Sequence, residues 1–383
     1  MVSTGPHAVI VGAGHAGFAA AAALRDRGYT GSVTLLGDED SMPYQRPPLS
    51  KGYLLGKVEQ RRLAFRPESF YTRHDITLRT GVAATGIDRA GRSVHLDSGE
   101  RVPYDTLILA TGARPRRLDI PGLDLEAVAT LRTLADVDAL APRLAGATRL
   151  AIVGGGFIGL ELAAVAASKG IDTVVLESAD RLLQRSLSEP TSAHVARAQR
   201  SWGTEIRTGA RVRGFAADGP SVRIDLGDDE VRADLVVVGV GAVPNVDLAA
   251  DAGLAVDDGV LVDTHLRTCD PAVFAIGDCA RFTTADGSTR RRESVQNATD
   301  QARAVARTVT GDPTPYQALP WFWSDQHDLK LQIAGDGTGH DEARIVGDPS
   351  TGSFSTSCYR EGRLVAVESI NDPTAHVAAR KQL

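Results

Sequence analysis

The stretch from His7 to Gly28 limits what this chain can fold into more than any other part of it. A short β-branched run, Ala8–Val11, is followed at once by the glycine-rich turn GAGHAG and then by an alanine-rich helix. This order predicts a strand, a tight turn and a helix N-terminus, which is the arrangement that binds the pyrophosphate of a dinucleotide. The free N–H groups of the first helical turn and the helix dipole favour the phosphate charge.

The glycines of this turn have separate predicted roles. Gly12 permits the sharp turn, Gly14 lets a pyrophosphate come close to the backbone, and Gly17 lets the helix lie near the strand. The next predicted strand, residues 32–36, ends at Gly37-Asp38-Glu39. An acidic residue at that place accepts hydrogen bonds from the adenosine ribose. We expect Asp38 in this role, with Glu39 as the alternative and an exposed turn acid as the competing interpretation.

The same pattern occurs a second time in the middle of the chain. Residues 149–153 (RLAIV) predict a strand, residues 154–159 (GGGFIG) form a second fingerprint, and residues 160–169 predict the helix that follows. A further strand over residues 172–176 ends in Glu177. Two complete units in one chain indicate dinucleotide binding far more specifically than a single glycine-rich turn does.

The acid that ends this second unit bears on which nicotinamide cofactor is used. Glu177 accepts hydrogen bonds from a ribose 2′-hydroxyl and repels a 2′-phosphate, and no arginine cluster follows it immediately. NADH is therefore favoured over NADPH, although Arg181 and Arg185 keep NADPH open. Glu161 is expected on the first turn of the second helix, near where a nicotinamide would lie. Its competing role is that of an acid stabilising a helix N-terminus.

The loop from Pro43 to Lys51 (PYQRPPLSK) is rich in proline, which fixes φ and removes backbone donors. We therefore predict a rigid loop that leads into a helix at Ser50. Arg46 and Lys51 are cations on this stiff support. They are placed against a flavin or its phosphates in one interpretation, and are ordinary surface charge in the other.

Two buried strands are predicted to end in small residues. Residues 105–110 lead into the turn Thr111-Gly112, where small side chains allow the backbone to approach a ligand or change direction. Residues 236–241 (VVVGVG) are apolar enough to be buried on both faces and end at Gly241.

The last third of the chain contains one more candidate ligand. Residues 272–280 predict a buried strand ending in Gly277-Asp278, where Asp278 is placed to accept a hydrogen bond from a ribityl hydroxyl. Arg290–Arg292 is expected to be a solvated loop, and residues 293–308 predict a helix. The final segment predicts a small antiparallel sheet with helices, whose strands cover residues 329–333, 344–346, 353–359 and 364–369.

Composition excludes several classes of function. A net charge of −6 and a pI near 5.9 argue against a nucleic-acid binder. No apolar run approaches the roughly 20 residues of a membrane helix, and no signal peptide precedes the first strand. The three cysteines have no metal-ligand spacing, which favours reduced thiols in a cytoplasmic protein.

The two fingerprints, the Ala110-Thr111-Gly112 turn and the Gly277-Asp278 strand end, in that order, resemble the two-dinucleotide-binding flavoprotein superfamily. Within it the chain is similar to bacterial ferredoxin reductases of the putidaredoxin and rubredoxin types. The resemblance covers essentially the whole chain. The segments that carry it are PYQRPPLSK (43–51), LRTLAD (131–136), GGGFIGLELA (154–163), GDCARF (277–282), ESVQNA (293–298) and PWFWSDQ (320–326).

This resemblance implies an α/β fold with two Rossmann-like dinucleotide-binding domains, as in glutathione reductase, and a small α+β C-terminal domain. Residues 1–112 and 242–318 would form a discontinuous FAD domain, residues 113–241 an inserted NAD domain, and residues 319–383 a C-terminal domain covering the flavin. These reductases usually continue beyond the position of Leu383, so no partner contact by a longer tail is carried over.

The resemblance also assigns binding residues. Lys51 would lie beside the isoalloxazine, Ala84 would contact the adenine side by its backbone, and Arg132 would contact the phosphates. Asp278 would take the ribityl chain and Val295 the flavin edge. The remaining FAD positions are Gly12, Gly14, Ala16, Gly17, Asp38, Arg46, Thr111, Gly112 and Trp323, and those for NADH are Gly154, Gly156, Phe157, Ile158, Gly159, Glu177, Arg185 and Gly241.

The chemistry that is missing separates this chain from other members of the superfamily. Disulfide and peroxide reductases there need a reactive cysteine near the flavin, yet residues 41–56 contain none. The resemblance then implies hydride transfer from NADH to FAD, followed by single-electron transfer to a [2Fe-2S] ferredoxin or a rubredoxin that feeds a P450, another monooxygenase or a dioxygenase. Lys51 and Glu161, as the catalytic pair, would stabilise the charge of the reduced flavin.

The electron acceptor and the assembly state are less constrained. Alternatives are an NADH-dependent flavin oxidase or quinone reductase, and a flavoprotein of the apoptosis-inducing-factor kind. Trp321 and Trp323 are expected at the partner surface, with plain domain packing as the competing role. Arg66, Arg303 and Arg307 are candidates for a basic face that steers an acidic ferredoxin. We expect a monomer or a weak dimer.

Overall fold

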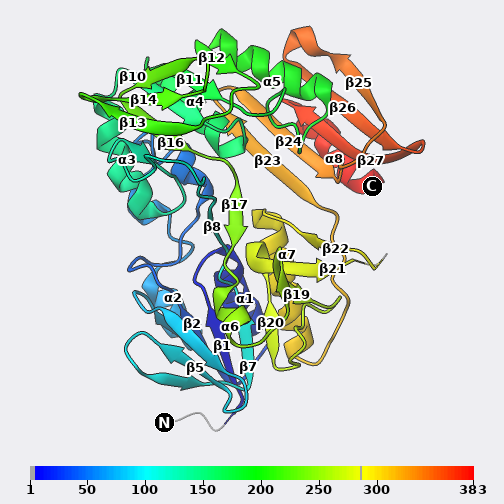
Figure 1. Ribbon diagram of the computed structural model, residues 1–383. Coiled ribbons are helices and arrows are strands. Elements are labelled where there is room, and N and C mark those ends of the chain that lie inside the picture. Colours follow the sequence, from blue (N-terminus) through cyan, green and yellow to red (C-terminus); the bar gives the residue numbers. More distant parts are fainter. Residues whose placement is uncertain (1–4, 285–286) are drawn as a thin grey trace. The chain divides into compact units, whose positions relative to one another are not determined.

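The computed structural model describes residues 5–284 and 287–383 (Figure 1). The chain forms two compact units, and each is built from three separate segments. The proposed three-domain boundaries stay a prediction, and one segment, Arg46–Glu59, belongs to the second unit although it follows the first fingerprint in sequence. The first unit comprises Met1–Gln45, Gln60–Arg114 and Val243–Ala318, and the second comprises Arg46–Glu59, Pro115–Ala242 and Leu319–Leu383.

The first unit is organised around a five-stranded parallel sheet in the order β20-β7-β1-β2-β3. Its strands are rich in Val, Ile and Leu, and all except the edge strand β3 are mostly buried, as strands covered on both faces must be. Helix α1 (His15–Asp26) packs along α7 (Val295–Val309). The strands are β1 (His7–Val11), β2 (Ser32–Leu36), β3 (Ile76–Arg79), β7 (Thr106–Leu109) and β20 (Val273–Ala275).

Smaller elements complete the first unit. One antiparallel sheet contains β4 (Ala84–Asp88), β5 (Ser93–Leu96) and β6 (Arg101–Pro103). A mixed sheet contains β18 (Val256–Asp257), β19 (Gly259–Val262), β21 (Ala280–Thr283) and β22 (Thr289–Arg291). The short helices are η2 (Gln60–Arg62), α2 (Glu68–Arg73), α6 (Asp247–Asp251) and η3 (Gly277–Cys279).

The second unit repeats the parallel arrangement in the order β12-β11-β10-β16-β9. A three-stranded antiparallel sheet, β13-β14-β15, accompanies it. The paired strands β8 (Ala113–Pro115) and β17 (Ala242–Pro244) contain two of the positions where the chain passes from one unit to the other. The other strands are β9 (Val128–Ala129), β10 (Arg149–Val153), β11 (Asp172–Leu176), β12 (Thr204–Arg207), β13 (Gly214–Asp218), β14 (Ser221–Asp225), β15 (Glu230–Ala233) and β16 (Leu235–Val238), and the helices are η1 (Pro47–Ser50), α3 (Leu134–Gly146), α4 (Phe157–Ser168) and α5 (Glu189–Ser201).

The C-terminal part of the second unit is the predicted small antiparallel sheet with a helix (Figure 1). Its strand order is β23-β24-β27-β26-β25, and α8 (Pro373–Gln382) packs on β24 and β27. The predicted α/β class with two parallel dinucleotide-binding sheets is confirmed. The elements are β23 (Trp321–Gln326), β24 (Leu329–Gly335), β25 (Glu342–Asp348), η4 (Pro349–Thr351), β26 (Ser353–Arg360) and β27 (Arg363–Ile370).

Three local expectations are wrong. The proline-rich loop forms η1, which ends at Ser50 instead of beginning a helix there, because two consecutive prolines favour a short tight turn. Helix α4 begins at Phe157, directly after its glycines, and not at Leu160. Residues 289–291 form strand β22 instead of a solvated loop, where Arg291 pairs with Asp258 at 3.2 Å and with Glu293 at 2.5 Å.

Candidate functional site

The glycine turn after β1 is shaped by backbone contacts that leave one position open. A Cβ at Gly12, where φ is +106°, would lie 2.2 Å from the Ala110 carbonyl oxygen. A Cβ at Gly17 would lie 1.8 Å from the Gly12 carbonyl oxygen, so both glycines are required by packing. A Cβ at Gly14 would meet nothing within 4 Å. The backbone at Gly14 is therefore free to approach a ligand.

The glycine turn after β10 has the same design. A Cβ at Gly154 (φ +109°) would lie 2.4 Å from the Gly239 oxygen, and one at Gly159 would lie 2.4 Å from the Gly154 oxygen. At Gly156 the nearest atom would be 4.0 Å away. Both units thus have two glycines that are required by packing and an open glycine between them.

The helices after these turns begin without caps of their own. The N-cap residues of α1 and α4 are Gly14 and Gly156, and neither helix has a capping side chain or an acid in its first turn. By contrast α3 begins with a full capping box made by Thr133 and Asp136. Uncapped N–H groups at a helix N-terminus suit a phosphate anion. Both turns therefore fit the pyrophosphate of a dinucleotide.

The acid at the end of β11 is tied to the second glycine turn. Glu177 accepts the Gly155 amide at 2.7 Å through Oε2 and the Ala179 amide at 2.8 Å through Oε1. The Ser178 hydroxyl also donates to Oε1, at 3.3 Å. Since a carboxylate oxygen has two acceptor directions, Oε2 can still accept a ribose hydroxyl. Ile158, in the first turn of α4, has an exposed apolar side chain beside this turn.

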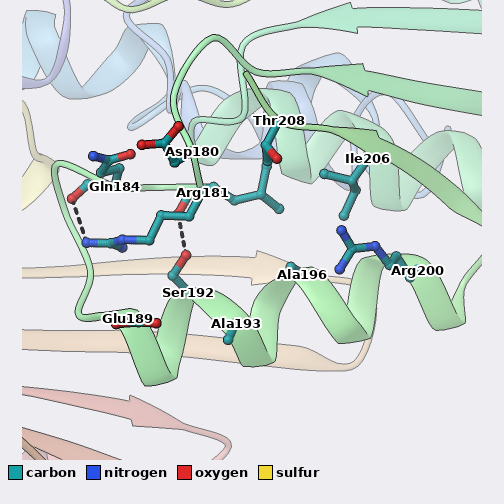
Figure 2. A pocket seen from close by; sticks show the side chains of 11 residues that line it. Asp180, Arg181, Gln184, Glu189, Ser192, Ala193, Ala196, Arg200, Ile206 and Thr208 are labelled. Atoms are coloured by element: carbon teal, nitrogen blue, oxygen red, sulfur yellow. Dashed lines mark hydrogen bonds between the residues drawn. The ribbon is translucent and has the colours of Figure 1, made fainter. Parts of the chain in front are cut away.

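Arg181 and Arg185, the two arginines that could bind the 2′-phosphate of NADPH, have different surroundings in the structure. Arg181 donates to the backbone oxygens of Leu187 at 2.8 Å and Gln184 at 3.1 Å, so its guanidinium holds its own loop together (Figure 2). Arg185 lies near Gly241, since a Cβ there would be 3.8 Å from Nη2 of Arg185. The structure thus brings together two of the positions predicted for NADH, Arg185 and Gly241.

A pocket of about 430 Å³ is lined by α5, by the loop of residues 180–184 and by residues 206 and 208 at the end of β12 (Figure 2). Arg181 and Arg200 contribute cations and Asp180 and Glu189 contribute carboxylates, so its lining has no dominant charge. Neither Glu177 nor any residue of the glycine turn is part of this lining. None of the residues predicted to bind NADH lines this pocket, whereas Arg181, which keeps NADPH open, does.

The first unit brings several predicted FAD residues to the first glycine turn. A Cβ at Gly277 would lie 2.9 Å from the Cβ of Ala16, which places the loop of Asp278 against the start of α1. Thr111 follows the Ala110 carbonyl that packs on Gly12, and its hydroxyl donates to the Asn245 oxygen at 2.7 Å. Three segments far apart in sequence thus meet at one helix N-terminus.

At the end of β2 the two candidate acids are distinguishable. The Tyr44 hydroxyl donates to Glu39 at 2.6 Å, whereas the Asp38 side chain is exposed. This agrees with Asp38 as the ribose acid, an assignment that stays a prediction. Ala84 and Val295 are the half-buried first residues of β4 and α7.

The remaining predicted FAD residues belong to the second unit, where Arg46 and Lys51 flank η1. Nη1 of Arg46 donates to the Arg132 oxygen at 3.0 Å. Nζ of Lys51 lies 2.8 Å from Oε2 of Glu161 and 3.3 Å from the Pro47 oxygen. The expected pairing of Lys51 with Glu161 is therefore present.

Glu161 is not the first-turn acid that its position suggested. Because α4 begins at Phe157, Glu161 lies in the second turn, and only 4% of its surface is exposed. Oε2 also accepts the Ser50 hydroxyl at 2.5 Å, and Oε1 accepts the Ser324 hydroxyl at 2.7 Å. One cation and two hydroxyl donors thus replace the water that this buried carboxylate would otherwise bind.

Strand β23 presents different residues on its two faces. Phe322 packs on Phe157 with ring centroids 4.5 Å apart, on the face that carries Ser324. On the other face Trp321 and Trp323 lie 5.5 Å apart. The guanidinium of Arg380 lies over the Trp321 ring at 4.7 Å, which is a cation–π contact. Both tryptophans are half-buried, so packing accounts for part of each side chain.

Sequence reasoning missed the hydroxyls around Glu161 and the polar residues behind them. Ser324 and Gln326 occupy alternate positions of β23 and have no exposed surface. Polar residues that share the buried face of a strand are a usable signal, because buried polar groups need partners. The aromatic residues of this segment suggest a partner surface and draw attention away from the polar residues between them.

The predicted basic face is partly neutralised by its neighbours. Arg303 pairs with Asp300 at 3.4 Å, and Arg307 pairs with Asp312 at 3.1 Å. Arg66 lies over the Phe70 ring at 5.7 Å. The steering role of these arginines stays a prediction.

The cysteines are thiols within the described part of the chain. Cys269 is exposed, while Cys279 and Cys358 are buried. Burial raises the pKa of the Cys279 thiol, and burial with the nearby Glu368 carboxylate raises the pKa of Cys358 to about 12. Within residues 5–284 and 287–383 we find no metal-binding cluster and no helix that could cross a membrane.

Comparison with known proteins identifies relatives along the full length. Rhodocoxin reductase from Rhodococcus erythropolis is 46% identical over 98% of this chain and 88% of its own. Putidaredoxin reductase from Pseudomonas putida is 39% identical over 95% of this chain and 88% of its own. The solved ferredoxin reductase of the CYP199A2 system from Rhodopseudomonas palustris superposes with a TM-score of 0.96 at 45% identity, covering 98% and 94% of the two chains.

More distant structures share the fold alone. The water-forming NADH oxidase from Lactobacillus brevis has a TM-score of 0.88 at 19% identity, covering 98% of this chain and 91% of its own. Residues 6–302 match the pyridine nucleotide-disulphide oxidoreductase family, and residues 321–383 match the reductase C-terminal family. The chain therefore belongs to the pyridine nucleotide-disulphide oxidoreductase family and carries a reductase C-terminal domain.

Proposed function

We propose that this chain is an FAD-dependent NADH:ferredoxin reductase that passes electrons to a [2Fe-2S] ferredoxin or a rubredoxin. The relatives named above act as reductases of such carriers, and a solved complex joins putidaredoxin reductase to putidaredoxin. Rubredoxin-NAD(+) reductase from Pseudomonas putida is 37% identical over 95% of this chain and 96% of its own. These proteins are oxidoreductases for electron transfer, and so is this chain.

The observation that carries the proposal is the ion pair in the segment where thiol-using relatives have cysteine. Residues 41–56 contain no cysteine, and Lys51 there is paired with buried Glu161. No thiol in this segment can accept electrons, so they must leave from the cofactor to an external carrier. A one-electron iron–sulfur protein is such a carrier.

The side chains bind, orient and provide charge for this chemistry. The Gly12–Gly17 turn and the start of α1 would hold the FAD pyrophosphate, with Asp38 on the ribose and Asp278 on the ribityl chain. Bound FAD supplies the conversion of hydride transfer into single-electron transfer, which amino-acid side chains cannot perform. Lys51 is paired with Glu161, and its positive charge would offset negative charge on the reduced ring system.

Nicotinamide specificity follows from the second unit. Glu177 offers its Oε2 to a ribose hydroxyl, and Arg181 is bound to backbone oxygens of its own loop. Arg181 is thus already engaged, and the negative charge of Glu177 opposes a 2′-phosphate. These contacts support NADH as the preferred donor.

The partner surface and cellular location are also part of the proposal. The half-buried Trp321 and Trp323, with Arg380 over the Trp321 ring, form an aromatic and basic surface suited to an acidic iron–sulfur protein. The buried thiols and the use of NADH support a cytoplasmic location. We propose a monomer or weak dimer.

Anaerobic stopped-flow absorbance tests this function. The FAD-loaded protein is mixed with NADH or NADPH and then with [2Fe-2S] ferredoxins, rubredoxin, a quinone or oxygen. We expect rapid bleaching of FAD by NADH and faster electron transfer to an iron–sulfur carrier than to the other acceptors. Rapid turnover with oxygen or quinone and none with any iron–sulfur carrier would refute the proposal and favour an oxidase or quinone reductase.

A further inference from the structure

A buried chain of polar side chains leads from helix α5 to Glu161. Nε2 of Gln199 donates to Oε1 of Gln326 at 2.9 Å, and Nε2 of Gln326 donates to the Ser324 hydroxyl at 3.3 Å. That hydroxyl donates to Oε1 of Glu161 at 2.7 Å. Gln199, Gln326 and Ser324 have no exposed surface, so water does not compete for these hydrogen bonds.

One backbone carbonyl sets the direction of every hydrogen bond between these buried polar side chains. The Leu160 oxygen can only accept, and it lies 2.9 Å from Nε2 of Gln199. The amide oxygen of Gln199 must then face the Thr204 hydroxyl, 3.3 Å away, while its NH₂ group faces Gln326. Gln326 in turn presents NH₂ to Ser324, whose hydroxyl hydrogen can only point at Glu161.

We propose that Gln199, Gln326 and Ser324 form a positioning chain that holds the Glu161 carboxylate in one orientation toward Lys51. The proposal deepens the ferredoxin reductase function proposed above, because it assigns these residues to the Lys51–Glu161 pair. The three hydrogen bonds from Gln199 through Gln326 and Ser324 to Glu161 all point the same way, toward the carboxylate, and such bonds strengthen one another in a buried site.

The two carboxylate oxygens of Glu161 thereby have separate tasks. Oε1 is held by Ser324, which is itself fixed by the chain, and Oε2 is left to Lys51 and Ser50. Without the Ser324 hydroxyl only the contacts of Oε2 restrain the carboxylate, so its orientation toward Lys51 is less fixed. Ser324 acts only through Glu161 and is a positioning residue.

A double-mutant cycle tests this coupling on the FAD-loaded protein. The variants are Ser324→Ala, Glu161→Gln and the double variant, and Ser369→Ala is the control. Ser369 lies on β27 of the same sheet, is fully buried, and its hydroxyl has no hydrogen-bond partner among the described residues. The control therefore removes the same atom from the same sheet without touching Glu161.

Three quantities are measured for each variant: the FAD midpoint potential, the visible absorption spectrum of FAD, and the rate constant for FAD reduction by NADH. Ser324→Ala should slow FAD reduction about tenfold, the effect of losing one hydrogen bond to a charged group. It should also shift the midpoint potential and the spectrum. In the Glu161→Gln background the same substitution should change none of the three, and Ser369→Ala should stay within about twofold of wild type.

Equal effects of Ser324→Ala with and without Glu161 would overturn the proposal, because they would show a structural role independent of the carboxylate. If Ser324→Ala does not fold, Gln326→Met replaces it, since Met fills the volume and cannot donate, and the same coupling is expected. None of these measurements uses ferredoxin. A failure of ferredoxin reduction would thus refute the proposed function and leave the cycle intact, whereas an additive cycle would refute only the positioning chain.

Discussion

Replacing Glu177 by Gln should reduce the preference of this protein for NADH over NADPH and weaken NADH binding as well. The carboxylate accepts the Gly155 amide through one oxygen and the Ala179 amide through the other. Glutamine has a single acceptor oxygen, so one of these two amides loses its partner. Leaving one partly buried N–H donor unpaired costs about 1–3 kcal/mol. Part of this cost should appear as weaker binding of NADH at the second glycine turn.

The change in specificity follows from the charge. A phosphate in place of the ribose hydroxyl would bring a like charge to about 4 Å from the carboxylate, which costs about 4 kcal/mol at an effective dielectric constant of 20. Glu177 is only half-buried, so we reduce this to about 2 kcal/mol. Since about 1.4 kcal/mol is a factor of ten, the NADH-to-NADPH preference should fall about 30-fold in the variant.

The assay is anaerobic stopped-flow reduction of bound FAD at varied NADH and NADPH, which separates the dissociation constant from the limiting rate constant. Asp180→Asn is the matched control, because it removes the same charge from an exposed side chain three residues further along the same loop. Charge-based selection by Glu177 would be refuted if Glu177→Gln kept the wild-type preference for NADH over NADPH. It would also be refuted if Asp180→Asn reduced this preference as much as Glu177→Gln does, because the carboxylate of Glu177 would then have no specific role in selecting the nucleotide.

Three further predictions rest on single contacts. Gly17→Ala should lose most bound FAD, because the new Cβ would lie 1.8 Å from the Gly12 oxygen, and the ratio of flavin to protein absorbance checks this, with retention of full FAD as the contrary result. Native protein at pH 8 should show one thiol reactive with a disulfide reagent, at exposed Cys269, because Cys279 is buried and the pKa of Cys358 is raised to about 12; three rapidly reacting thiols would be inconsistent with this burial. Burial, and then the Arg380 charge, lowers the pKa of His376, so its protonation favours the unfolded chain. Stability should be full above the unfolded pKa of about 6.5 and fall as the pH drops through and below it, and urea unfolding followed by tryptophan fluorescence should show a smaller fall for His376→Leu than for wild type.

Local pattern was enough to predict the framework of both dinucleotide sites. The strands at residues 32–36, 149–153 and 172–176 have the predicted bounds because each is a short β-branched run with a turn signal at its end. The glycine roles could be predicted because a strand, a tight turn and a helix can only join closely if specific positions lack a Cβ.

The environment of Glu161 could not be predicted in the same way. Its donors come from Ser50, 111 positions before it, and from Ser324, 163 positions after it. Nothing local to residues 154–163 shows that η1 and β23 pack on α4. The helix start was placed three residues late because Phe157, Ile158 and Gly159 are weak helix formers, and tertiary packing overrides that preference here.

Electrons should leave bound FAD for an iron–sulfur carrier without passing through a protein thiol. A variant in which Cys269 becomes Ser and Cys279 and Cys358 become Ala tests this most directly. After anaerobic reduction of its FAD by NADH, this variant should reduce a [2Fe-2S] ferredoxin with a rate constant within about twofold of wild type. Loss of ferredoxin reduction while NADH still reduces the FAD would contradict the claim.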